Sequence, residues 1–148
     1  MAKKTKYYAL DALGNEHTRT TARVYTHMVV LMVSQKNRRA FITGDDNRKV
    51  QARNHAFYCR EATEQPNPNY GEPKGYRDFC KEAAGMTCGE YVEKKIAEQL
   101  AVLNANGAGD YEDFYRDCGW CSRLDLAQKL AAKWAGNGKV EILEAQTK

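Results

Sequence analysis

The stretch VYTHMVVLMV, residues 24–33, is the most apolar part of the sequence and decides the fold. Its β-branched and aromatic residues favour a strand. After Met28 the residues on both faces are apolar, which is typical of a strand in the middle of a sheet. The sequence therefore predicts that this segment is a central strand. The apolar run is too short to cross a membrane, which takes about 20 residues.

Further strands and helices are predicted on both sides of this strand. Upstream, a strand over residues 6–12 turns at Gly14 and the chain returns through residues 18–21. Downstream, we expect helices over residues 35–43, 46–64, 76–84, 87–105 and 122–135, and strands over 114–120 and 139–145. Thr87 and Glu90 have capping-box spacing, and Ser122 is predicted to cap the last helix.

The order of these elements is β-β-α-α-(α)-α-β-α-β, which predicts an α+β protein. We expect about four strands in a mainly antiparallel sheet, with three to five helices packed on it. The 148 residues are enough for a single globular domain over 1–148. All three prolines fall within residues 65–75, which predicts an exposed loop there.

Composition and termini predict a small soluble protein of the cytoplasm. The basic N-terminus is not followed by the apolar segment of a signal peptide, and no membrane contact is expected. The five cysteines are an odd number, which argues against a closed disulfide framework. No Walker A, Rossmann, H-E-x-x-H or G-x-S-x-G motif is present, so the sequence favours a binding protein over an enzyme.

The positive charge is concentrated in residues 36–60. The net charge of the chain is +4, whereas this segment alone carries an excess of +5. Its basic residues are Lys36, Arg38, Arg39, Arg48, Lys49, Arg53 and Arg60. Helical spacing would align the last three of these, and an arginine donates two hydrogen bonds to one phosphate.

The basic segment is the predicted binding site for nucleic acid or for an acidic protein partner. His55 and Tyr58 lie within it and are predicted to stack on bases. No helix-turn-helix, zinc-finger or RRM signature accompanies the charge. A solvated helix surface is the plainer interpretation of the same residues.

The motif CGWC, with Cys118 and Cys121, suggests an alternative function. The pair precedes a predicted helix, and a helix N-terminus stabilises a thiolate. This is the arrangement that dithiol oxidoreductases use. Only 27 residues follow Cys121 and none is proline, so the similarity does not extend to a whole redox domain.

Zinc binding is the second interpretation of the cysteines, and a structural role is the third. Cys-x-x-Cys is a good half-site for zinc, with Cys80 and Cys88 as the other half. The interval from Cys80 to Cys88 is wider than usual for such a site. Reduced cysteine is also a common core residue, and we favour this structural role. The roles of Tyr25, His27 and Trp120 stay open at this point.

Overall fold

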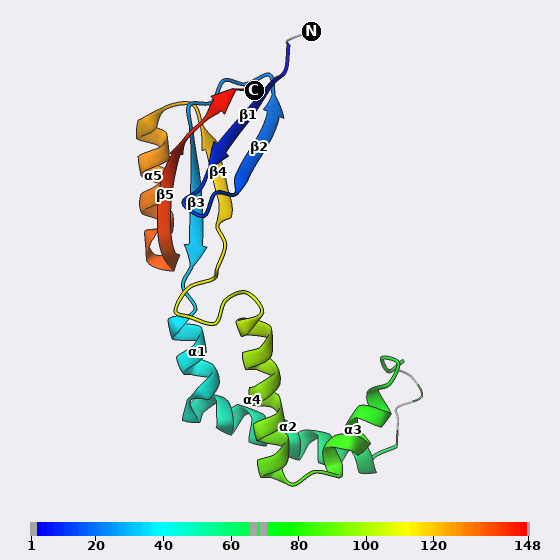
Figure 1. Cartoon of the computed structure of the whole chain (residues 1–148). Helices are drawn as coiled ribbons and strands as arrows, with labels where there is room; N and C mark the ends of the chain where they lie inside the picture. Colours follow the sequence, from blue (N-terminus) through cyan, green and yellow to red (C-terminus); the bar gives the residue numbers. More distant parts are fainter. Residues whose placement is uncertain (1–2, 66–67, 69–70, 148) are drawn as a thin grey trace. The chain divides into compact units, whose positions relative to one another are not determined.

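The chain divides into two compact units, each with its own hydrophobic core (Figure 1). The computed structural model describes residues 3–65, 68 and 71–147. Unit 1 contains the residues up to Lys36 and those from Asn106 onward, and unit 2 is Asn37–Ala105. Unit 2 is therefore inserted into the sequence of unit 1. The expectation of one domain over residues 1–148 stays a prediction.

The central sheet of unit 1 is built around the apolar strand. Strand β3 (His27–Val33) lies between β4 (Arg116–Cys121) and β5 (Gly138–Glu144), and both pairings are antiparallel. Met28 and Val29 are both fully buried, although they point to opposite faces. Burial on both faces is what the continuous apolar run predicts for a central strand.

A second sheet of unit 1 is formed by the two ends of the chain. Strand β1 (Thr5–Leu10) pairs with β2 (Glu16–Thr21) and, on its other edge, with β6 (Gln146–Thr147). The β1–β2 connection contains Gly14 at a φ of 84°, a conformation that glycine adopts without strain. Ala9 of β1 belongs to the cluster of buried residues that also holds two residues of β3.

Helix α5 (Leu124–Trp134) covers one face of the central sheet (Figure 1). Ala127 of this helix packs with Val29 and Cys121 of the sheet. The opposite face carries the cluster of Ala9, Met28 and Val30. A short 3-10 turn, η1 (Ala135–Asn137), then leads from α5 into β5.

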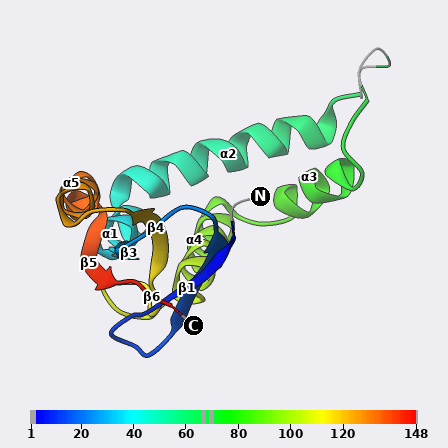
Figure 2. The same cartoon turned by 90° about the horizontal axis from the view of Figure 1, so that it is seen from above.

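Unit 2 is helical. Its helices are α1 (Lys36–Thr43), whose first residue belongs to unit 1, α2 (Asp45–Thr63), α3 (Tyr76–Ala84) and α4 (Cys88–Asn104). Helix α2 contacts both α3 and α4, and α3 lies alongside it (Figure 2). The apolar core of the unit joins Ile42 of α1 to Val92 and Ile96 of α4. Thr87 Oγ1 accepts a hydrogen bond of 3.1 Å from the Glu90 amide, which confirms the predicted cap of α4.

The predicted α+β class is confirmed, with two differences in detail. The strands form two antiparallel sheets of three, and residues 16–21 form a strand of their own. Ser122 does not cap α5: the N-cap residue is Arg123, without a side-chain cap bond. Within the predicted loop the described residues are exposed, and residues 66, 67, 69 and 70 lie outside the described residues. No helix in the described part of the chain has the length and apolar character to cross a membrane.

Candidate functional site

Helix α2 presents three basic side chains on one face. Lys49, Arg53 and Arg60 are all exposed, and at 100° per residue they fall within about 40° of one another around the helix. Along the axis they are separated by about 6 Å and about 10 Å. None of the three forms an ion pair with another described residue. We call these three residues the basic face.

The opposite side of α2 is buried and polar. Asn47, Gln51 and His55 recur every four residues and point toward the rest of unit 2. The Asn47 amide nitrogen donates hydrogen bonds of 2.7 Å to the Ile42 carbonyl and 2.8 Å to the Gln99 side chain. This buried side fixes the rotation of α2 about its axis and therefore directs the basic face outward.

The other basic residues of segment 36–60 do not join the basic face. Arg48 forms an ion pair with Glu93 of α4. Arg39 donates to the side chain of Asn104, and the guanidinium of Arg38 lies 5.8 Å from the ring centroid of Phe41. Lys36 belongs to unit 1. The structure thus brings together three of the seven predicted binding residues.

Two exposed apolar side chains lie beside the basic face. Phe57 is 44% exposed and Val50 is 37% exposed. Phe57 falls between Arg53 and Arg60 along the helix, turned about 40° from Arg53 and about 60° from Arg60 around the axis. Phe57 was not singled out from the sequence, because its exposure depends on which side of α2 meets α3 and α4.

The predicted stacking role of His55 is wrong, because its ring is buried. Its Nε2 donates to the backbone carbonyls of Ala83 (2.9 Å) and Met86 (3.1 Å) at the end of α3. These bonds join α2 to the last turn of α3 and to Met86 in the connection that follows it, so His55 has a structural role. Tyr58 is half-buried, and its ring packs edge-on against Phe79 at 4.8 Å.

The two cysteines of the CGWC motif both contact helix α5, because strand β4 contains a bulge. Residues three apart on a regular strand point to opposite faces. Here the register with β3 shifts between Gly119 and Asp117, and Cys118 is the extra residue. Cys118 and Cys121 therefore pack in the same cluster as Ala127.

Both thiols are in surroundings that disfavour a thiolate. Burial raises the pKa of Cys118, and the charge of Asp117 raises it further. Burial also raises the pKa of Cys121. A redox dithiol needs the opposite shift. The pair also ends a strand, and two residues separate Cys121 from the first residue of α5.

The four cysteines predicted for zinc are divided between the units. Cys80 is buried in α3 and Cys88 is exposed at the start of α4, both in unit 2. Cys118 and Cys121 belong to unit 1. Over residues 3–65, 68 and 71–147, no group of three or more His, Cys, Asp or Glu side chains is arranged to hold a metal ion.

A cluster that the sequence did not predict joins the β1–β2 hairpin to β4. The ring of His17 lies between two carboxylates, with Nε2 at 2.7 Å from Asp11 Oδ2 and Nδ1 at 2.5 Å from Asp117 Oδ1. Asp11 also accepts hydrogen bonds from the amides of Leu13 and Asn15. The carboxylates lie on opposite sides of the ring, so the arrangement is an ionic clamp. His17 and Asp117 are 100 residues apart in sequence, so no local sequence pattern indicates that they are in contact.

The aromatic residues left open by the sequence have packing partners in unit 1. Trp120 packs against the cluster of Ala9, Met28 and Val30. The ring of Tyr25 lies 6.1 Å from that of Trp120, and His27 Nδ1 lies 2.8 Å from the hydroxyl of Thr26. These contacts give Trp120 and Tyr25 roles in the core of unit 1.

Comparisons with protein-family models, with curated proteins and with solved structures found no match for this chain.

Proposed function

We propose that unit 2 binds single-stranded nucleic acid through the basic face of α2. The observation that carries the proposal is the alignment of Lys49, Arg53 and Arg60 on the side of α2 that faces solvent. Side chains that already pair with carboxylates gain little from a phosphate. These three have no such partner among the described residues.

Phe57 supports an unpaired strand as the ligand. Proteins that bind single strands combine cations along the backbone with exposed aromatic rings on which bases stack. Phe57 lies beside the basic face with almost half of its surface accessible. A base-paired duplex hides the base faces, so an exposed phenyl ring would add little to its binding.

The first test measures fluorescence anisotropy of a labelled oligothymidylate with the purified chain. We expect saturable binding that weakens as salt rises, because bound lysine and arginine release counterions from the phosphates. A duplex of the same length should bind more weakly, and an acidic peptide should compete poorly. Tighter binding of the acidic peptide than of the oligonucleotide would identify a protein partner instead.

A further inference from the structure

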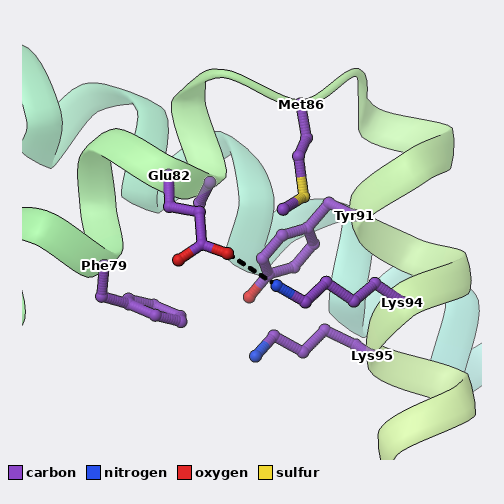
Figure 3. Close-up of a pocket in the computed structure, with 7 residues that line it drawn as sticks. Phe79, Glu82, Met86, Tyr91, Lys94 and Lys95 are labelled. Atoms are coloured by element: carbon purple, nitrogen blue, oxygen red, sulfur yellow. Dashed lines mark hydrogen bonds and ion pairs between the residues drawn. The ribbon is translucent and has the colours of Figure 1, made fainter.

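A small open pocket in unit 2 combines aromatic rings with charged groups (Figure 3). Phe79 and Glu82 of α3, Met86 of the connection, and Tyr91, Lys94 and Lys95 of α4 line it. The basic face lies on α2, so the pocket is formed by other residues of the unit.

The ammonium group of Lys95 occupies the space between two rings of this pocket. Its Nζ lies 4.9 Å from the ring centroid of Phe79 and 5.5 Å from that of Tyr91. The Lys95 side chain is only 22% exposed. A cation within about 6 Å of a ring centroid is attracted by the electrons of the ring face. The two rings therefore already hold a cation, which is one of the chain's own.

Other side chains hold both rings in place. Tyr58 packs edge-on against Phe79, with centroids 4.8 Å apart and an interplanar angle of 87°. The ring of His55 lies 5.1 Å from that of Tyr91, which is 3% exposed. An aromatic pair fixed in this way is ready for a ligand without the cost of ordering it.

One carboxylate lines the pocket, and it is paired with a lysine. Glu82 Oε1 lies 2.8 Å from Lys94 Nζ, and Figure 3 shows this ion pair at the rim of the pocket. The hydrogen bond from Lys94 lowers the pKa of Glu82, so its carboxylate is charged at neutral pH. Burial raises the pKa of Tyr91, so its phenol stays neutral.

We propose that this pocket binds a methylated ammonium group, and that Lys95 fills it when no ligand is present. Methyl groups prevent an ammonium from hydrogen-bonding to water, so such a cation gains more from ring faces than a lysine does. Lys95 has a second partner one turn along α4, because Glu98 Oε2 lies 3.1 Å from its Nζ. Displaced from the rings, Lys95 retains this ion pair.

The test is a choline titration followed by the NMR resonances of the aromatic rings. Choline should shift the resonances of Phe79 and Tyr91 in the unchanged chain. Lys95→Ala should tighten binding, by about tenfold for a Lys95 that fills the site about nine-tenths of the time, because the apparent affinity scales with the fraction of time the site is free. Lys81→Ala is the matched control, because it removes the same charge from an exposed position on α3 that does not line the pocket. Far-UV circular dichroism shows whether each variant keeps its helices.

Several results would overturn the proposal. They are unmoved ring resonances in the unchanged chain, equal tightening by Lys81→Ala, and equal binding of 3,3-dimethylbutan-1-ol, the neutral analogue of choline. A parallel titration with Nε-trimethyllysine separates the two sources of such a group. Tighter binding of trimethyllysine points to a modified protein tail, and tighter binding of choline points to a small metabolite or headgroup.

Discussion

Asp117 Oδ1 lies 2.5 Å from Nδ1 of His17, which connects strand β4 to strand β2 of the other sheet in unit 1. Burial lowers the pKa of His17, but the hydrogen bonds to Asp11 and Asp117 outweigh it, and the net pKa is raised. For Asp11, burial raises the pKa, but His17 and the backbone amides of Asn15 and Leu13 lower it overall. The imidazolium between two carboxylates is thus the favoured state.

This clamp predicts a stability optimum in mildly acidic solution. The contribution of His17 to the free energy of unfolding is complete below the unfolded pKa of 6.5 and is lost as pH rises through its higher folded pKa. The contribution of Asp11 is complete above 3.8 and is lost as pH falls through its lower folded pKa. Thermal unfolding at a series of pH values should therefore show the highest Tm between pH 3.8 and pH 6.5.

His17→Gln should remove the decrease in Tm that the clamp predicts above pH 6.5. The substitution deletes hydrogen bonds between charged groups, and we expect a loss of about 1.5–3 kcal/mol at pH 6. His27→Gln is the control, because the ring of His27 contacts the hydroxyl of Thr26 and has no carboxylate partner among the described residues. An identical decline of Tm above pH 6.5 with and without His17 would contradict this account.

Reaction with iodoacetamide at neutral pH should distinguish the cysteines. Cys88 is exposed, whereas burial raises the pKa of the Cys118 and Cys121 thiols, and only the thiolate reacts. We therefore expect Cys88 to be labelled first and the CGWC pair to react at a useful rate only after unfolding. Peptide mass spectrometry over time gives the order. Early labelling of Cys118 or Cys121 would restore the redox interpretation.

Gly138→Ala should destabilise unit 1 strongly. Gly138 has a φ of 156°, and an added Cβ would lie 2.1 Å from the Met32 carbonyl oxygen. Backbone strain and overpacking together predict a loss of about 2–4 kcal/mol. Gly136→Ala is a close control, because nothing lies within 4 Å of its added Cβ. Equal urea midpoints for the two variants would argue against the β3–β5 pairing described here.

Phe57→Ala tests the choice of a single strand. Loss of one stacked base should weaken oligothymidylate binding by about 1–3 kcal/mol and leave the salt dependence unchanged. Val102→Ala is the control, because Val102 is a strongly exposed apolar residue on α4. Unchanged affinity for Phe57→Ala would remove the argument for stacking, and the phosphate contacts would then carry the binding alone.

Local sequence patterns predicted most of the helices and strands. How these are grouped into two sheets and two units depends on contacts between residues far apart in sequence. The apolar run, the Thr87 cap and the spacing of the helices gave segments close to those observed. The weak apolar pattern of α2 has its explanation in Asn47, Gln51 and His55, which are buried polar residues held by hydrogen bonds. No local pattern marks such a face.

The sequence indicates the candidate site only in part, because local spacing does not show contacts between distant residues. Helical spacing predicted that Lys49, Arg53 and Arg60 share one face, and a single helix, α2, spans all three. It could not show that Arg48 pairs with Glu93, 45 residues away in sequence. Nor could it show that a bulge at Cys118 turns both cysteines toward α5, because a bulge is defined by the partner strand.

The most direct test of the basic face is the salt dependence of oligothymidylate binding by charge variants of α2. Each phosphate contact to a single strand contributes about 0.7 to the slope of log affinity against log salt concentration. Arg53→Ala should reduce the magnitude of this negative slope by about 0.7. Removal of all three basic-face charges should reduce it by about 2. Arg48→Ala removes the same charge from the same helix, but Arg48 pairs with Glu93 and should leave the slope unchanged. Equal slopes for Arg53→Ala and Arg48→Ala would contradict binding through this face.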